Sequence, residues 1–325
     1  MKKQILAAAV AASVSAVALA DISITGAAKV NYTNVDVSGS TPDTNKFTQE
    51  TDLKIKGKNG DTEVVVNFGG ASLDNTASTS DARTGSSNNM NVEDVYVTTK
   101  IAGVNLKAGT WDNGNNELRA SSRADGKFNA TTSVGGIDLG FATGSNGASQ
   151  EEFTVGTNVG GVALSYTKKA TGETVKASTS LGGVNVKYLG LPSDTANNDA
   201  HYVEVSTKVG DVDVKVGQAT ADSANTIAGD TWMGDYEGNT SGAYMLSAGQ
   251  DVQAIELKTA MAGNTVTFRN VKIDGVANED TDFNKLIVTR PLASGATFEL
   301  TYTALDDTVN ANDSDTLDLE LAVSF

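Results

Sequence analysis

Few side chains in this sequence could act as nucleophiles, acid–base catalysts or metal ligands. The 325 residues include no Cys and a single His, His201. The absence of Cys excludes thiolate zinc sites, disulfides and cysteine nucleophiles, and one imidazole excludes a multi-histidine metal site. Ser206 and Asp199 lie near His201 in the sequence, so a serine hydrolase is chemically possible. No G-x-S-x-G motif supports it, and we expect no catalytic residues, no metal and no cofactor.

Charged residues are the other side chains that could determine what the chain binds. Asp and Glu number 40 against 24 Lys and Arg, which gives a net charge of −16. Such a surface repels phosphate backbones, so we expect no nucleic-acid partner. Most of the acids fall in polar stretches, where they attract cations or, as an alternative, bridge divalent ions. No EF-hand spacing and no calcium-binding nonapeptide repeat is present.

Residues 1–20 have the layout of a secretory signal peptide. Lys2 and Lys3 precede an Ala-rich apolar run, and an A-x-A cleavage signal, 18–20, ends it before Asp21. The alternative is a short transmembrane anchor, but the run is too short to span a bilayer and ends in small residues rather than in a charged stop. We therefore expect cleavage before Asp21 and an exported single domain over 21–325.

Throughout the rest of the chain, apolar and polar residues alternate with the period of a β-strand. In the last segment one face is entirely apolar and consists of Leu317, Leu319, Leu321, Val323 and Phe325. Thr, Val and aromatic residues dominate similar segments, as a half-buried pleated surface favours. Helical spacing is almost absent. The sequence therefore predicts an all-β protein.

Tight turns and long polar stretches alternate between these segments. The tight turns contain Gly and lie at 58–60, 102–103, 135–136, 160–161, 182–183, 210–211 and 262–264. The long stretches are rich in Asn, Asp, Ser, Thr and Gly and occupy 36–46, 71–90, 112–126, 144–150, 191–200, 220–250, 274–282 and 306–314. In an up-and-down sheet this alternation puts all tight turns at one end and all long loops at the other. Outer-membrane barrels have short periplasmic turns and long extracellular loops in this way.

The aromatic residues indicate a membrane interface at the long-loop end. Those on the apolar faces of their strands, close to long loops, are Tyr32, Phe47, Phe68, Phe128, Phe141, Phe153, Tyr166, Tyr188 and Tyr302. A one-sided belt is expected at a membrane–water boundary and not in the core of a soluble sandwich. We count about 18 alternating segments, with 16 equally compatible, which suffices to enclose an aqueous channel. The sequence predicts a transmembrane antiparallel up-and-down β-barrel of 16–18 strands.

This layout resembles that of the Gram-negative general diffusion porins over nearly the whole chain. The resemblance is carried by a first strand, Asp21–Gly26, directly after the signal, by the hairpin over 286–304, and by an alternating last strand that ends in Phe325. It implies a homotrimer of 16-stranded channels in the outer-membrane lipid, through which small hydrophilic solutes and ions diffuse passively. It also implies that the barrel-assembly machinery recognises the strand ending in Phe325, and that the third long loop, 112–126, folds inward to narrow the pore.

If the apolar faces meet lipid, the alternate faces line the water. Early strands then contribute basic residues and late strands acidic ones to the lumen wall: Lys29, Lys54, Lys56, Lys107, Glu299, Asp318 and Glu320. The candidate constriction in 112–126 has charges of both signs: Asp112, Glu117, Arg119, Arg123 and Asp125. Opposed charges across a constriction would create a transverse field that orders polar solutes. The alternative is that these are solvated loop charges outside the pore.

Two other functions are compatible with the sequence. A substrate-selective sugar or nutrient channel would differ from a nonspecific pore in only a few lumen side chains; Trp111 has inward parity, but one aromatic makes no track. A β-rich surface adhesin or structural protein would share the acidic, Thr- and Asn-rich composition and the export signal. It would not explain the alternation of turns and loops or the one-sided aromatic belt.

Overall fold

The computed structural model describes residues 21–37, 44–69, 73–74, 91–112, 118, 123–144, 151–169, 172–194, 196–223, 227–229, 232–233, 244–246, 249–274, 281–307 and 313–325. The expected signal peptide, 1–20, lies outside the described residues. In the described part of the chain, no helix is long and apolar enough to cross a membrane.

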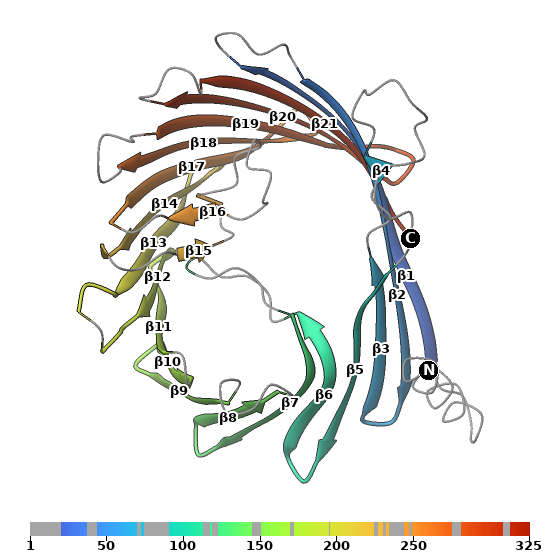
Figure 1. The fold of residues 1–325 in the computed structure, drawn as a ribbon, viewed down its shortest axis with the longest axis vertical. Coiled ribbons are helices and arrows are strands. Elements are labelled where there is room, and N and C mark those ends of the chain that lie inside the picture. Colours follow the sequence, from blue (N-terminus) through green and yellow to red (C-terminus); the bar gives the residue numbers. More distant parts are fainter. Residues whose placement is uncertain are drawn as a thin grey trace.

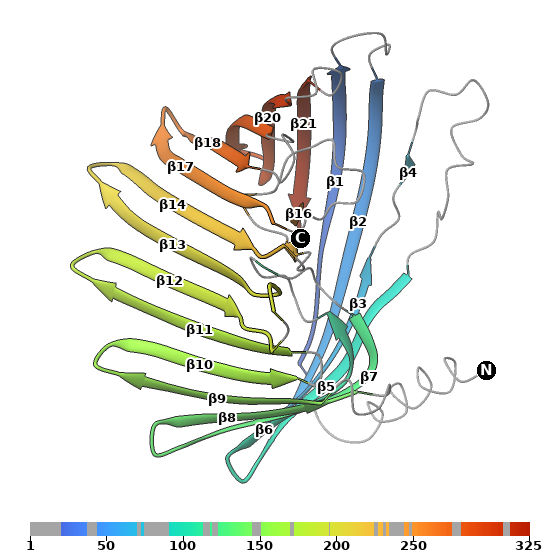
Figure 2. The ribbon, with the colours of Figure 1, turned by 60° about the vertical axis from the view of Figure 1, so that its left-hand side comes forward.

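The strands form one large antiparallel sheet that curls into a barrel (Figures 1 and 2). In chain order its long strands are β1 (Asp21–Val37), β2 (Thr44–Asn59), β3 (Thr62–Gly69), β5 (Asn91–Ile101), β6 (Val104–Asp112), β7 (Arg123–Val134), β8 (Ile137–Thr143), β9 (Glu152–Val159), β10 (Val162–Lys169), β11 (Gly172–Leu181), β12 (Val184–Leu191), β13 (Ala200–Val209), β14 (Val212–Ala221), β17 (Asp251–Met261), β18 (Asn264–Asp274), β19 (Thr281–Pro291), β20 (Ala296–Asp307) and β21 (Ser314–Ser324). Two short elements complete the fold. The two-residue β4 (Leu73–Asp74) pairs with β2, and β15 (Ile227–Gly229) pairs with β16 (Tyr244–Leu246) in a separate hairpin.

Each long strand pairs with its chain neighbours, and β1 also pairs with β21, so 18 strands close an up-and-down barrel. The predicted all-β barrel and the count of 18 are confirmed. The 16-strand count, which the resemblance to general diffusion porins implied, is wrong.

The carboxyl terminus takes part in closing the barrel. The backbone N–H of Gly26 donates to the Phe325 carbonyl at 2.8 Å, and the N–H of Phe325 donates back at 2.9 Å. The Phe325 ring lies against Gly26, because a Cβ atom at residue 26 would come within 2.5 Å of that ring. The last residue is therefore fixed on the first strand by a backbone pair and a ring contact.

Tight turns connect most of the strands at one end of the barrel, as predicted. Gly182 and Gly183 have φ of 60° and 83°, which the two-residue hairpin turns of twisted sheets require. The other end differs from the prediction in two places. The connection between β6 and β7 is shorter than 112–126, because Asp112 and 123–126 belong to strands. Only residues 170–171, which lie outside the described residues, separate β10 from β11.

The two faces of the sheet differ as the alternation predicts. Eight of the nine belt aromatics are 36–50% exposed on the outer face; Phe68, the ninth, is partly buried. Val97, Leu139, Leu164 and Val186 are outward-facing aliphatic residues of the same kind. The outer face is therefore apolar with aromatic residues toward the long-loop end, as a lipid-facing surface requires.

Candidate functional site: the barrel lumen

The inner face of the barrel carries most of the polar side chains. Lys107 on β6 lies opposite Thr98 of β5 and Asn129 of β7. Ser165 on β10 lies opposite Lys176 of β11, on the same face. Hydroxyl, amide and charged side chains thus continue from strand to strand on the inside, as in a barrel that holds water.

One part of the inner face is apolar instead. At the long-loop ends of β12–β19, a cluster of buried residues points into the barrel: Leu189, Leu191, Ala200, Tyr202, Ala219, Ala221, Val252, Ala254, Val271, Ile273 and Phe283. Leu118, from the connection between β6 and β7, and Met233, from the connection between β14 and β17, complete this cluster, each 1% exposed. We call these strand ends the covered wall, because residues from two loops pack on it from the lumen side. The β15–β16 hairpin of the second loop lies inside the ring of strands (Figure 1).

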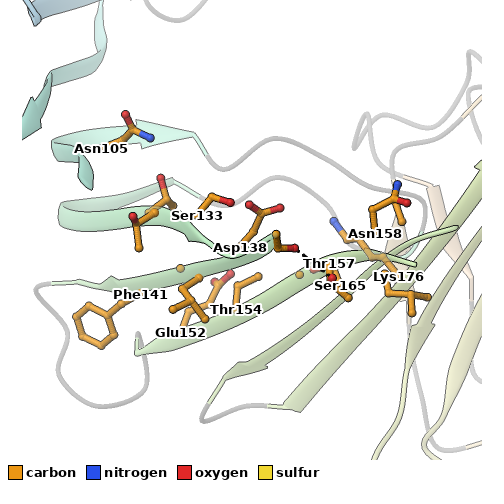
Figure 3. A pocket seen from close by; sticks show the side chains of 18 of the residues that line it. Asn105, Ser133, Asp138, Phe141, Glu152, Thr154, Thr157, Asn158, Ser165 and Lys176 are labelled. Atoms are coloured by element: carbon orange, nitrogen blue, oxygen red, sulfur yellow. Dashed lines mark hydrogen bonds between the residues drawn. The ribbon is translucent and has the colours of Figure 1, made fainter. Parts of the chain in front are cut away.

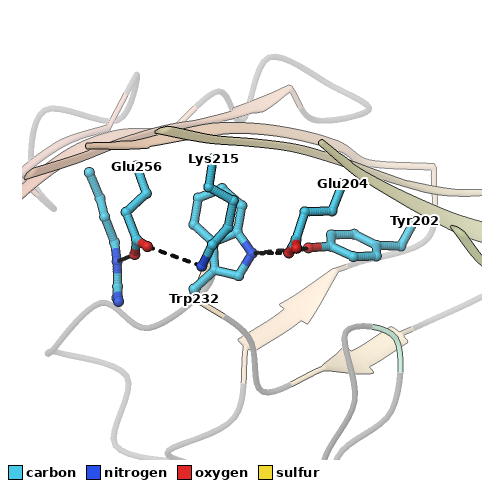
Figure 4. Close-up of polar contacts among 6 residues, drawn as sticks. Tyr202, Glu204, Lys215, Trp232 and Glu256 are labelled. Carbon is cyan, nitrogen blue, oxygen red and sulfur yellow. Dashed lines mark hydrogen bonds and ion pairs between the residues drawn. The ribbon is translucent and has the colours of Figure 1, made fainter. Parts of the chain in front are cut away.

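Hydrogen bonds fix Trp232, the neighbour of Met233, to this wall (Figure 4). Its indole Nε1 donates to the Tyr202 hydroxyl at 3.0 Å and to Glu204 Oε2 at 3.2 Å. The Tyr202 hydroxyl in turn donates to Glu204 at 2.6 Å. The Lys215 ammonium lies 4.6 Å from the centre of a Trp232 ring, a cation–π distance. The wall therefore holds the loop through both apolar and polar contacts.

Two further features of the covered wall depend on small size and on charge pairing. Gly217 leaves room for the loop, since a Cβ atom there would come 2.7 Å from the Trp232 ring and 2.8 Å from the Met233 sulfur. Beside it, the Glu256 carboxylate pairs with Lys215 at 3.0 Å and with Arg269 Nε. The Glu256 side chain is only 9% exposed, so its negative charge is needed to balance two largely dehydrated cations.

A second aromatic group lies on β5 and β6. Trp111 points inward, as predicted, and is 7% exposed; its ring meets Tyr96 edge-on with centroids 6.3 Å apart. The Lys107 ammonium lies 3.9 Å from the Tyr96 ring centre and 4.4 Å from that of Trp111, and Lys127 lies 5.3 Å from Trp111. These rings therefore contact ammonium groups of the wall itself.

The wall between β7 and β11 is different in character (Figure 3). A hollow there is lined mainly by short polar and small side chains, among them Ser133, Thr154, Ser165 and Ser178, with Gly140 and Gly156 between them. We call it the open wall. No residue outside the strands lines this hollow except Gly136 of a tight turn, in the described part of the chain. Short hydroxyl side chains leave the space in front of them available to water and solutes.

All seven predicted lumen-wall residues lie on the inner face. Lys29 pairs with Glu50 of β2 at 2.6 Å, and Lys56 pairs with Glu63 of β3 at 3.3 Å. Lys54 lies between them on the same face, and Lys107 contacts the two aromatic rings described above. Lys29 and Lys56 therefore have acidic partners on neighbouring strands of the same wall.

Two of the three late acidic residues accept hydrogen bonds from hydroxyl groups. The Thr33 hydroxyl donates to Asp318 at 2.8 Å, and the Thr289 hydroxyl donates to Glu299 at 2.8 Å. Glu320 lies opposite Glu299 on β20. These residues meet the Lys29 region at barrel closure, as the sequence predicted for the two ends of the sheet.

The candidate constriction residues are placed only in part. Asp112 ends β6, and its backbone N–H donates to the Asp94 carboxylate at 3.1 Å. Arg123 and Asp125 belong to β7, but their side chains, and the whole of Glu117 and Arg119, lie outside the described residues. This set stays a prediction. Leu118, between the last two, is nevertheless buried in the lumen cluster.

The covered wall is the part of the site that the sequence reasoning missed. On β18, Val266 and Phe268 face outward, whereas Val271 and Ile273, farther toward the long-loop end, face inward and are buried. Lys272 there faces outward and is exposed. The apolar parity therefore switches within one strand. This switch is visible in the sequence and could have revealed that something packs inside the barrel.

The residues considered for a serine hydrolase do not share a face of the sheet. His201 faces outward on β13, whereas Ser206 faces inward on the same strand, because the two lie an odd number of positions apart. Among the described residues, no group of three or more His, Asp or Glu side chains could hold a metal ion.

Comparisons with known proteins rest on structure. No protein-family model matches the sequence, and no curated protein matches it significantly. Several solved bacterial structures are similar over most of their length. OccK2 (OpdF) of Pseudomonas aeruginosa has a TM-score of 0.65 at 12% identity, and OccK9 (OpdG) of the same species has 0.64 at 15%. OccAB4 of Acinetobacter baumannii has 0.63 at 11%. Each comparison covers 94% of this chain and 98% of the other.

At these identities the likeness concerns the fold. The sequence resemblance to porins is thus confirmed at the level of architecture, with 18 strands in place of 16. The chain has the closed β-barrel fold of these bacterial proteins.

Proposed function

We propose that the protein is a water-filled channel of the Gram-negative outer membrane, through which small hydrophilic solutes and ions diffuse passively. The observation that carries the proposal is a closed barrel with an apolar outer face and a polar inner face, narrowed from one side by loop residues on the covered wall. The open wall leaves hydroxyl-lined space beside them. The structures with the same fold include an outer membrane protein by name, OprD of Pseudomonas aeruginosa.

The loop between β6 and β7 is our proposed constriction. Leu118 packs on the covered wall, and in the sequence Glu117 and Arg119 flank it directly. Because Leu118 is anchored inside the barrel, chain connectivity would keep its sequence neighbours near the lumen, which favours the constriction over the alternative of loop charges outside the pore. Arg119 and Arg123 would then raise the local positive potential and oppose the passage of cations.

Single-channel recording tests the proposal. The refolded protein should give large conductance steps in a planar bilayer, and a salt gradient should give a definite reversal potential. Replacing both Arg119 and Arg123 with Ala should shift the reversal potential toward cation preference. Absence of conductance after verified insertion would refute the channel. Unchanged selectivity in the double variant would refute the role of the two arginines only.

Two features are proposed from the porin resemblance. The first is a homotrimer, which would give conductance steps in groups of three. The second is recognition of the carboxyl-terminal strand by the barrel-assembly machinery; the fixed position of Phe325 on Gly26 supports a role in closure. Deleting Phe325 should therefore lower the yield of folded barrel in cells, measured by heat-dependent mobility in SDS gels.

A second candidate function is a channel that prefers organic carboxylates. Cations recur on the inner face of several strands, among them Lys107, Lys176 and Lys187. One of the structures with the same fold, OccK2, is a complex with glucuronate. Glucuronate should then interrupt the ion current at concentrations at which glucose, its neutral analogue, does not. Equal effects of the two compounds would leave passive diffusion as the better description.

A further inference from the structure

The tight-turn end of the barrel is unusually apolar. In five of its two-residue turns, the two residues that flank the turn and pair with each other are both aliphatic. These pairs, called here the rim pairs, are Ile101–Val104, Val134–Ile137, Val159–Val162, Leu181–Val184 and Val209–Val212. Their first members are 59–80% exposed, with Leu181 the most exposed. Exposed aliphatic residues at every one of these turns need a partner.

The rim pairs continue the outer face of the barrel without a break. Val159 shares its face with Val155 and Phe153 of β9, and Leu181 shares its face with Ala177 and Val175 of β11. The turn residues between the members of a pair are Gly or Ala, with Asp211 as the one charged exception. The surface that contacts the rim must therefore be the one that contacts the outer face above it.

The turn between β2 and β3 provides a comparison within the same barrel. Its flanking pair is Asn59–Thr62, on the same outer parity, and Asp61 lies in the turn itself. Of the two strands at this turn, β2 has 16 residues and β3 has 8, whereas the strands that flank the rim pairs have between 7 and 12. The polar pair thus ends the longest strand of this comparison, and the apolar pairs end shorter ones.

The height of the apolar surface explains this difference. On β8, β10 and β12, the belt aromatics Phe141, Tyr166 and Tyr188 lie four residues beyond the rim residues of their strands. Four residues rise about 13 Å along a strand and about 10 Å along the membrane normal at a tilt near 40°, against about 25 Å for the apolar band of a typical outer-membrane barrel. Because the apolar band is this short, it extends to the turns themselves, and no outward-facing strand residues remain there to form a polar zone in the periplasmic water.

The upper limit of the band is independently fixed on β14, β17 and β18. Outward-facing residues change there from apolar to polar, at Val216–Gln218, Ile255–Gln253 and Phe268–Asn270. Inward-facing residues change from polar to apolar at the same level, where loop residues cover them. The polar outward-facing residues therefore mark the level at which water meets the outer face. Since the band ends here, any further contact with lipid must extend toward the turns.

We propose that the rim pairs from β5 to β14 are immersed in the inner leaflet of the membrane, in contact with phospholipid acyl chains, while the β2–β3 turn projects into the periplasmic water. This inference rests on the proposed location in the outer membrane. The short wall then brings the bilayer boundary to the turns themselves, and the adjoining lipid thins to match it, as hydrophobic mismatch requires. A docking site for a periplasmic protein is the competing explanation for the exposed aliphatic residues.

The chain allows a direct test because it contains no Cys, so that a single introduced Cys can be labelled alone. Leu181→Cys and Asn59→Cys form a matched pair, because each residue is the first member of the pair that flanks a two-residue turn. Each full-length variant is labelled with an environment-sensitive fluorophore and reconstituted in phosphatidylethanolamine–phosphatidylglycerol vesicles. Heat-dependent gel mobility and channel conductance are recorded first, and their loss in the wild-type protein would count against the proposed function alone.

With insertion verified, the label at residue 181 should emit at shorter wavelength than the label at 59. Lipids spin-labelled high on the acyl chain should quench it, and aqueous iodide should quench it several-fold less than the label at 59. Val159→Cys repeats the measurement at a second rim pair. Equal quenching by iodide at 59, 159 and 181 would overturn the proposal. Protection from iodide that appears only when periplasmic extract is added would also overturn it and would favour a protein partner.

Discussion

The covered wall and the open wall belong to the same barrel, yet their inner faces follow opposite rules. The covered wall buries apolar residues such as Val252 and Phe283 under Leu118 and Met233 from two loops. The open wall exposes Thr and Ser side chains, with glycines in place of bulk. Both are built from strands with the same antiparallel pairing. The difference lies in what each inner face contacts, protein on one side and water on the other.

This contrast shows how a barrel can be narrowed without changing its strand number. Loop residues need an apolar surface to pack on, so the wall that receives them exchanges polar for apolar inward residues at its outer end. The open wall, which no described loop residue covers, keeps polar inward residues. The position of the loops is thereby determined by the strands beneath them.

Removing Glu256 should have the largest effect on stability. Glu256→Ala leaves Lys215 and Arg269 side by side on the covered wall without their shared carboxylate, which should lower the free energy of unfolding by about 3 kcal/mol. Denaturant unfolding in detergent micelles measures this change. Glu63→Ala, which breaks the more exposed Lys56–Glu63 pair, is the control and should lose at most about 1 kcal/mol. Equal losses would mean that the covered wall is not dehydrated.

Releasing the loop from the covered wall should have the next largest effect. Trp232→Ala removes two hydrogen bonds of about 1 kcal/mol each, together with the ring contact at Gly217. The loop should then leave the wall and single-channel conductance should rise roughly twofold, since the free cross-section grows. Planar-bilayer recording measures this.

Gly217→Leu should also release the loop from the covered wall, without changing any loop residue. Its side chain would occupy the space of the Trp232 ring and the Met233 sulfur, so it should raise conductance as Trp232→Ala does. An unchanged conductance in both variants would show that the loop does not narrow the pore.

Substitution on the open wall should have the smallest effect. The hydroxyls of Thr154 and Thr167 share one hydrogen bond of 2.9 Å on half-buried side chains. Thr154→Val with Thr167→Val keeps the shape and removes both partners, so the free energy of unfolding should change by less than about 1 kcal/mol. Conductance should remain near that of the wild type. A loss as large as that of Glu256→Ala would show that the open wall is packed against something after all.

The sequence predicted the barrel well because lipid and water enforce period two on every strand. The alternation in Leu317–Phe325 and the one-sided belt of aromatics such as Phe141 and Tyr188 follow directly from that requirement. Parity also placed Lys29, Glu299 and Trp111 on the inner face. These inferences need only local information, so no knowledge of loop position was required.

The covered wall could not be predicted by the same rule. Period two assumes that the inner face meets water along the whole strand, and this fails where Leu118 and Met233 pack inside. On β18 the apolar residues change from the outward face at Phe268 to the inward face at Val271, where the covered wall begins. Which loop residues cover the wall depends on contacts between residues far apart in the chain, such as Trp232 with Tyr202, and no local pattern encodes them.

Access of neutral polymers to the pore tests the central claim most directly. Polyethylene glycols of graded size are added to one side of a bilayer that holds the oriented channel, and the smallest excluded size is determined for each side. If the pore is narrowed at its long-loop end, the smallest excluded polymer should be smaller for addition from that side than for addition from the tight-turn side. Trp232→Ala should reduce this difference in size between the two sides. Equal exclusion from both sides in the wild type, unchanged in the variant, would contradict a channel narrowed from its covered wall.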